Sequence, residues 1–318
     1  MLESIIKKNR PNLAQSSIKT YLSSLSRIIK DVKVELKTPE DFIKNIDAIL
    51  EKAKDYTPIV RKSKLASIIV LLDDKDGLED TGEYKDKDKT DAIKKLRFVM
   101  QKDMKTVDEE ETNQELSENQ KQNFIPQDDI FKIYELLKEQ TAPLFKLNTL
   151  NKKQFDMMQM YVLLSLYILI PPRRTMDFTH FKIRNINPEV DNYFLIPKRK
   201  KDLGAFVFNQ YKNAKKLGPQ ILERIPKELE RIIDKWMQYN KSDYLLVNSV
   251  GKQVAGSKIA LWLNEIFGKR ISTSMLRHIY LTHKFGNVNL KELKDTAEDI
   301  GNSGIERMLK YVQKNEDA

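Results

Sequence analysis

The chain has 318 residues, 40% of them hydrophobic and 32% charged, which leaves enough apolar material for two folded domains. The lack of cysteine excludes disulfides, thiolate metal sites, iron–sulfur clusters and a cysteine nucleophile. The net charge of +10 favours a polyanionic partner, because neutralising phosphates releases counterions, although a lysine-rich genome would raise the charge equally.

Helical periodicity dominates the first hundred residues. Apolar residues repeat on one helical face over four segments, namely Ser17–Ile29, Pro39–Lys52, Thr57–Leu72 and Ala92–Asp103. Asp74–Thr90 is dense in Asp, Lys and Gly and predicts a loop. Met104–Gln122 is polar with an acidic run at 108–111, which predicts a linker. We therefore expect a helical domain over residues 1–103, a polar linker over 104–122 and a second domain over 123–318.

The second domain mixes helices with a few short strands. Phe155–Ile170 is apolar nearly all round, so we expect a central helix, broken by Pro171-Pro172. Three runs predict strands, with residues 212–219 as the turn between the last two: Tyr193–Ile196, Ala205–Tyr211 and Gln220–Ile225. Further helices are expected from Pro126 and over Lys227–Asn240, Lys258–Phe267, Thr273–Phe285, Leu290–Asp299 and Ile305–Lys314. The predicted fold is mainly α with a small antiparallel β-sheet.

Motifs of several familiar enzyme classes are missing from the sequence. There is no Walker phosphate loop, no dinucleotide fingerprint and no GxSxG elbow, and the three histidines, His180, His278 and His283, lack metal-ligand spacing. The apolar stretch Met157–Pro172 is too short to span a bilayer comfortably, and the first residues lack the apolar core of a signal peptide. We expect a soluble intracellular protein without a metal site.

Several basic residues and a tyrosine occur in suggestive short segments. Arg174 opens RTMD after the double proline, and Lys212 lies in YKNAKKLGPQ, where a strand enters its turn. Arg277 lies in the predicted helix TSMLRHIYLT, and Tyr311 follows the segment IGNS near the C-terminus. Taken singly, each has an ordinary explanation as a surface arginine, a turn lysine or a core tyrosine. Their joint order and spacing carry more information.

In that order and spacing, the segments resemble the tyrosine recombinase (phage-integrase-like) family, especially divergent members from eukaryotic mobile elements and large DNA viruses. The family has an arginine with Glu or Asp three residues later, a hairpin lysine, a His-x-x-Arg box, and Leu-Gly-His/Trp-Ser before its nucleophilic tyrosine. The resemblance covers roughly residues 124–316 and implies a helical core-binding domain before it. It implies catalytic roles for Arg174, Lys212, Ser274, Arg277, Asn302 and Tyr311, the last as nucleophile, with Asp177 and His278 in support.

Two positions depart from the family pattern. Ser274 stands where the box has histidine, and Asn302 stands where the last motif has histidine or tryptophan. The first change removes a proton-transfer group but keeps a hydroxyl that can bond a phosphate oxygen. The second replaces a large ring with a short amide. These departures leave both arginines, the lysine and the nucleophile in place.

The resemblance further implies a partner and a reaction. The partner is double-stranded DNA, held between the two domains by a protein that self-associates as a dimer or tetramer, with no membrane involved. The reaction is strand cleavage and rejoining through a 3′-phosphotyrosyl intermediate, which requires no cofactor, metal or ATP. Candidate DNA-binding residues are Lys198, Arg199, Lys200, Lys201, Lys215 and Lys216. The run 198–201 also fits a solvated loop or a nuclear localisation signal, so the compartment could be a nucleus or a viral replication compartment.

Three functions stay open at this point. The leading hypothesis is a site-specific recombinase or integrase. A type IB topoisomerase-like nicking and closing enzyme would use a similar Arg, Lys, Arg, Tyr set and act as a monomer. A catalytically impaired, recombinase-derived DNA-binding protein would account for Ser274 and Asn302 as signs of lost chemistry.

Overall fold

The chain forms two compact units, Met1–Asn113 and Gln114–Ala318. The computed structural model describes residues 1–74, 82–112, 118–197, 203–285 and 296. Within these ranges no helix is both long enough and apolar enough to cross a lipid bilayer. Nor do the described residues gather three or more His, Asp or Glu side chains in an arrangement suited to a metal ion.

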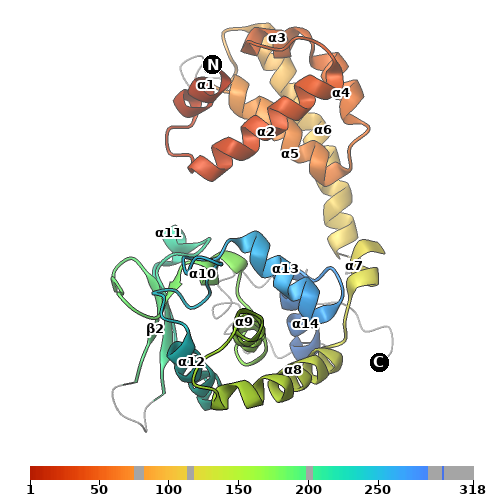
Figure 1. Ribbon diagram of the computed structural model, residues 1–318. Coiled ribbons are helices and arrows are strands. Elements are labelled where there is room, and N and C mark those ends of the chain that lie inside the picture. Colours follow the sequence, from red (N-terminus) through yellow and green to blue (C-terminus); the bar gives the residue numbers. More distant parts are fainter. Residues whose placement is uncertain (75–81, 113–117, 198–202, 286–295, 297–318) are drawn as a thin grey trace. The chain divides into compact units, whose positions relative to one another are not determined.

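The named secondary-structure elements in the described part of the first unit are all helices. Its elements are α1 (Leu2–Asn9), α2 (Gln15–Val32), α3 (Pro39–Lys44), α4 (Ile46–Ala53), α5 (Pro58–Leu72) and α6 (Lys87–Thr112) (Figure 1). The predicted helix at Ser17–Ile29 is confirmed as α2, and Ile18, Leu25 and Ile28 of its apolar face lie in the core of the unit. Burial of this face is the main source of stability for such a helix, because propensity alone contributes little.

The helix predicted over Pro39–Lys52 is in fact two helices. A capping box starts α3, in which Thr38 accepts a hydrogen bond from the backbone N–H of Asp41. Asn45 separates α3 from α4, and its side-chain amide donates to the carbonyl oxygen of Asp41 at 2.8 Å. Such local side-chain bonds compete with helical backbone pairing, which explains the break.

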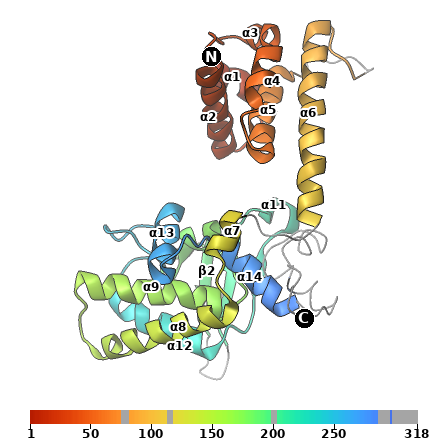
Figure 2. The same cartoon turned by 90° about the vertical axis from the view of Figure 1, so that its right-hand side faces the viewer.

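Helix α6 is longer than predicted and includes residues 104–112 of the expected linker. Figure 2 shows it as one continuous helix. Arg61 of α5 makes two 2.7 Å bonds to the carboxylate of Asp103, and Val107 is buried one turn further on. These contacts extend the packed part of α6 beyond the residue where the predicted helix ended, so the predicted linker begins as helix rather than as irregular chain.

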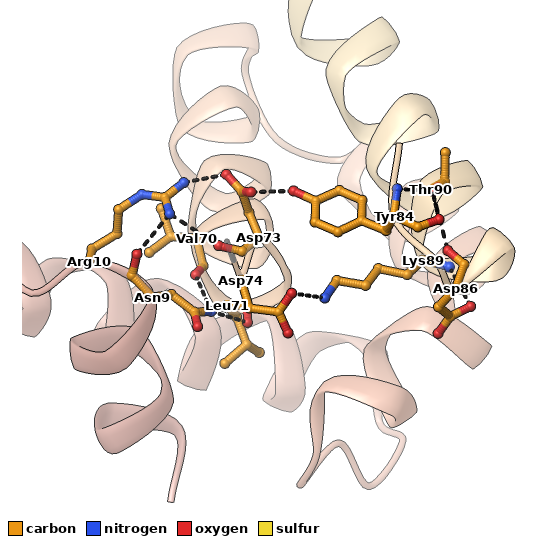
Figure 3. A network of polar contacts seen from close by, with 10 residues as sticks. All are labelled: Asn9, Arg10, Val70, Leu71, Asp73, Asp74, Tyr84, Asp86, Lys89 and Thr90. Atoms are coloured by element: carbon orange, nitrogen blue, oxygen red, sulfur yellow. Dashed lines mark hydrogen bonds and ion pairs between the residues drawn. The ribbon is translucent and has the colours of Figure 1, made fainter. Parts of the chain in front are cut away.

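A polar network ties together the ends of α1, α5 and α6 (Figure 3). Asp73, directly after α5, pairs with Arg10, directly after α1, and accepts a hydrogen bond from the Tyr84 hydroxyl. Lys89, near the start of α6, lies 2.6 Å from Asp74 and 4.6 Å from the centroid of the Tyr84 ring. The loop predicted over Asp74–Thr90 ends earlier than predicted, because α6 begins at Lys87, and these contacts anchor both of its ends.

The second unit contains nine named helical elements in its described part, together with a small sheet. The helices are α7 (Glu118–Asn123), α8 (Gln127–Thr141), the 3₁₀ turn η2 (Ala142–Lys146), α9 (Lys152–Ile168), α10 (Thr175–Thr179), α11 (Ala214–Leu217), α12 (Lys227–Tyr239), α13 (Gly256–Phe267) and α14 (Thr273–Phe285). Helix α9 lies at the centre of this unit, with α8, α12, α13 and the sheet around it (Figure 1). Its residues from Met158 to Tyr167 are buried except Met160, which confirms the predicted central helix.

Gln159 is the polar exception on this central helix. Its side chain is 1% exposed and pairs with one backbone residue, accepting from the Val247 N–H at 2.7 Å and donating to the Val247 carbonyl at 3.1 Å. The Gln159 side chain thus provides hydrogen-bond partners for both the backbone N–H and the backbone carbonyl of buried Val247. Gln159 therefore ties the loop after α12 to α9.

Replacing Gln159 with leucine should destabilise the second unit although it removes a buried polar group. Leucine has similar size but leaves the Val247 N–H and carbonyl without these partners, which costs about 2 kcal/mol. Urea unfolding followed by circular dichroism measures the change. The matched control is Gln140→Leu at an exposed position of α8, for which we expect a change within about 0.5 kcal/mol. Equal stabilities of the two variants would contradict this role for Gln159.

The sheet has four strands in the order β1 (Phe181–Lys182), β2 (Asn192–Leu195), β3 (Ala205–Phe208) and β4 (Gln220–Leu222). The three predicted strands are confirmed as antiparallel neighbours, and the cross-strand row Tyr193, Val207, Ile221 gives their register. Strand β1 was not predicted and pairs in parallel with β2, so the sheet is mixed rather than purely antiparallel. Two residues are too few for the alternation that signals a strand.

Aromatic side chains cover the inner face of the sheet. Phe206 of β3 packs edge-on against Phe194 of β2 and against Phe208. Phe206 and Phe208 also contact Phe178 and Phe181, at edge-on or tilted angles. Such pairs add to the hydrophobic stabilisation that their burial provides. The cluster fixes α10, which carries Phe178, on the sheet.

Candidate active site

The first predicted arginine lies at the start of α10. Pro171-Pro172 ends the central helix region, the chain continues extended through Arg174 (φ −71°, ψ 150°), and α10 begins at Thr175. Arg174 is therefore the N-cap residue of α10 and is half-buried. Asp177, three residues later, is fully buried. Prolines do not fit inside a helix, so the preceding helix cannot continue through Pro171-Pro172. The chain therefore begins a new, short helix after Arg174.

Asp177 pairs with Arg173, the residue before the predicted catalytic arginine. Arg173 Nε donates to Asp177 Oδ2 at 2.9 Å, and both side chains are 1% exposed. Burial lowers the pKa of the Arg173 guanidinium, and the nearby Asp177 carboxylate acts in the opposite direction. The second carboxylate oxygen, Oδ1, has no hydrogen-bond partner among the residues described, so it keeps an acceptor position for a further donor.

The second predicted arginine lies on α14. Ser272 precedes this helix, and its hydroxyl accepts from the Met275 N–H at 3.1 Å, as an N-cap does. Arg277 is 6% exposed, and its Nη2 donates to the Ser274 hydroxyl at 3.1 Å. Ser274 is exposed at the start of the helix. The two residues that matched the His-x-x-Arg box therefore lie together on one face of α14.

A direct contact joins the two arginine-bearing helices. The hydroxyl of Thr175, the first residue of α10, lies 2.8 Å from the hydroxyl of Thr273, the first residue of α14. Gly256 at the start of α13 allows a third helix to approach, because a Cβ there would lie 3.2 Å from the Thr175 methyl carbon. The helix starts of α10, α13 and α14 thus meet at one place.

The meeting of these helices brings several arginine side chains close to Asp177. Burial raises the pKa of the Asp177 carboxyl above its ordinary value. Three guanidiniums lie close enough to oppose this rise in pKa, namely those of Arg173, Arg174 and Arg277. One carboxylate beside three guanidiniums leaves an excess of positive charge, which is suited to a phosphodiester anion.

The connection between β3 and β4 begins beside α10. The side chain of Asn192 donates to the carbonyl oxygens of Asp177 (3.0 Å) and Gln210 (2.7 Å), so the start of this connection is held beside α10. The Tyr211 hydroxyl donates to the Gly218 carbonyl at 2.7 Å and closes the connection into a compact turn. Lys212 is exposed within this turn.

The connection also contains a short helix where the sequence predicted a plain turn. Helix α11 ends at Gly218, whose φ of +73° is strained for any residue with a Cβ. Lys215 and Lys216 of α11 are exposed. His278 is half-buried on α14, one residue beyond Arg277.

The remaining predicted site residues lie outside the described part of the chain. These are Asn302, Tyr311 and the basic run Lys198, Arg199, Lys200 and Lys201. The helices predicted over Leu290–Asp299 and Ile305–Lys314 also lie outside it, except for Thr296.

Arg173 is the site residue that the sequence reasoning missed. The resemblance implied a role for Arg174 and none for the residue before it. The i, i+4 spacing of Arg173 and Asp177 is a signal for an ion pair when both lie in a helix. Because the double proline delays the helix to Thr175, that signal was hidden.

No family model matches this sequence, and no curated protein is similar to it in sequence. Solved structures do share its fold. The XerH site-specific recombinase bound to a palindromic difH substrate, in a post-cleavage complex, has a TM-score of 0.59 at 14% identity, covering 99% of this chain and 81% of that chain. A dimer of lambda integrase (75–356) bound to a COC′ core site has a TM-score of 0.55 at 10% identity, covering 99% and 94%. The chain therefore has the fold of the tyrosine recombinases.

Proposed function

We propose that this chain is a site-specific DNA recombinase that cleaves and rejoins strands through a 3′-phosphotyrosyl intermediate. The observation that carries the proposal is the 2.8 Å contact between the Thr175 and Thr273 hydroxyls. Through it, Arg174 and Arg277, far apart in the sequence, are held beside the same buried carboxylate, Asp177. Paired guanidiniums that act on one phosphate can stabilise the negative charge that develops during phosphoryl transfer without a metal.

In the proposed cleavage step, the Tyr311 oxygen forms a bond to the scissile phosphorus while the bond from phosphorus to the 5′-oxygen breaks. The phenol proton is released to solvent, and the Lys212 ammonium donates a proton to the leaving 5′-oxygen. Arg174 and Arg277 bind the non-bridging oxygens as negative charge develops on them. Rejoining is the reverse, with a 5′-hydroxyl attacking the phosphotyrosine, so the phosphodiester energy is conserved without ATP.

The remaining predicted residues have supporting roles in this scheme. Ser274 is exposed beside Arg277 and could donate a hydrogen bond to a phosphate oxygen, as could Asn302. Asp177 orients the guanidiniums around it, and His278 supports the site from α14.

DNA binding and self-association belong to the same proposal. Among the structures that share this fold, XerH was solved bound to its palindromic difH substrate, and lambda integrase was solved as a dimer bound to a COC′ core site. Exposed Lys215 and Lys216 beside the site supply positive charge for backbone phosphates, and we assign the same role to the run 198–201. We further propose that residues 1–103 form a core-binding domain and 123–318 the catalytic domain.

Covalent trapping tests the proposed chemistry. The full chain is incubated with a nicked duplex library in EDTA, quenched in SDS and run on a denaturing gel. We expect a DNA-linked protein band that protease removes, and sequencing of the trapped DNA gives the target site. Binding of DNA without any adduct would contradict the enzymatic proposal and favour the non-catalytic DNA-binding protein. Relaxation of supercoiled plasmid by a monomer, without strand exchange, would favour the topoisomerase.

A further inference from the structure

Arg173 has a buried guanidinium for which the proposed chemistry has no use. Its side chain is 1% exposed, and its carbon Cζ lies 3.8 Å from the centroid of the Phe208 ring. Burying a charge is costly, and an apolar side chain of similar size is often at least as stabilising as a buried ion pair. What the ion pair adds is a defined geometry, since a planar guanidinium directs its donors in set directions.

The contacts of Arg173 join α10 to both ends of the connection between β3 and β4. On the α10 side, Nε donates to Asp177. At the entry to the connection, Phe208 and Tyr211 lie under the guanidinium, the Tyr211 centroid at 5.5 Å. At the exit, Nη2 donates to Gln220 Oε1 at 3.0 Å. A single side chain therefore spans the turn that carries Lys212.

We propose that Arg173 is a positioning residue that holds the Lys212 turn in a fixed place relative to Asp177 and Arg174. The inference rests on the proposed function, in which Lys212 is the general acid. Arg173 does not touch the phosphate in this scheme. It acts through the turn, so its removal impairs protonation of the leaving oxygen more than it impairs DNA binding.

Two substrates separate this role from general structural damage. One is the ordinary phosphodiester duplex, and the other carries sulfur in place of the scissile 5′-oxygen. A thiolate leaves without protonation because thiols are far more acidic than alcohols, so the sulfur substrate does not need the general acid. Single-turnover cleavage by the full chain is measured on both substrates at saturating DNA, below the melting temperature of every variant.

The variants form a matched set. Lys212→Ala and Arg173→Met should each slow phosphodiester cleavage by about 100-fold and sulfur-substrate cleavage by less than about threefold. Arg173→Lys keeps the positive charge but loses the forked donors of the guanidinium. Its phosphodiester cleavage rate should lie between those of Arg173→Met and wild type. Gln220→Leu keeps the ion pair between Arg173 and Asp177 and removes the hydrogen bond from Arg173 to residue 220, so it should show the same pattern with about a 10-fold effect.

The control is Arg184→Met. Arg184 is another structural arginine of this unit, and it donates to the carbonyls of Met237, Asn240 and Ser242 at the end of α12. Its loss should lower the melting temperature and leave both cleavage rates unchanged. This control separates loss of stability from loss of positioning.

The outcomes discriminate clearly. A phosphodiester-specific defect in Arg173→Met supports the inference, whereas equal defects on both substrates, or none, overturn it. If Arg173→Met does not fold, the same comparison on Gln220→Leu decides. If Lys212→Ala shows no rescue by sulfur while wild type forms its adduct, the inference fails and the recombinase proposal stands. If wild type cleaves neither substrate, the proposed function itself fails.

Discussion

Replacing Tyr311 with phenylalanine is expected to abolish the covalent DNA adduct while leaving DNA binding intact. The substitution removes the phenol oxygen that attacks phosphorus in the proposed mechanism and changes little else in the side chain. Nothing in the proposed site substitutes for this nucleophile, so the loss should be complete within the sensitivity of the SDS gel. DNA affinity, measured by fluorescence anisotropy, should change by less than about twofold, because the phosphate-binding arginines and lysines remain.

The matched control removes a phenol hydroxyl elsewhere in the second unit. Tyr193 lies half-buried on β2, and Tyr193→Phe should keep the adduct at the wild-type level. Persistence of the adduct in Tyr311→Phe would show that another residue is the nucleophile. Peptide mapping of the trapped DNA would then identify it.

Arg277→Lys is expected to lower the rate of strand cleavage by about 1,000-fold. An ammonium keeps the charge but cannot form the two-pronged bond of a guanidinium to phosphate oxygens, and removal of one such contact in a preorganised site costs about 100- to 1,000-fold or more. Arg277 is nearly buried beside Asp177, where screening by water is weak, so we place the effect at the upper end. Single-turnover cleavage at saturating DNA is the measurement.

The control for this prediction is Arg231→Lys on α12, an exposed arginine for which we expect wild-type rates. Melting temperatures of both variants establish that the folded fraction is unchanged at the assay temperature. A rate for Arg277→Lys within about threefold of wild type would exclude Arg277 from the phosphate-binding pair, because loss of a preorganised donor has a far larger effect.

Local patterns predicted most of the helices and strands of the described residues. The bounds of α14 agree with the predicted Thr273–Phe285, and α9 is the central helix that its apolar composition indicated. Both depend on periodicity and on nearby breakers, which are encoded within a few residues. Two of the failures have longer-range causes. Helix α6 continues past Asp103 because Arg61 of another helix binds there, and β1 exists because β2 offers a partner.

The candidate site likewise has features that the sequence predicts and features that depend on the tertiary structure. The spacing of Arg174 and Asp177, and of Ser274 and Arg277, is a property of short segments and was visible in the sequence. That Asp177 pairs with Arg173 was not visible, because the pair depends on where the helix begins and on Phe208 and Gln220 from the sheet.

By itself, the sequence determined the residue types available for chemistry, their order along the chain and the helices that carry them, because propensity and periodicity act over a few residues. The tertiary structure alone decided that α10 and α14 meet at Thr175 and Thr273, and that the Lys212 turn is tied to α10 through a buried guanidinium. Such contacts depend on how whole elements pack, and packing joins residues whose separation along the chain carries no local signal.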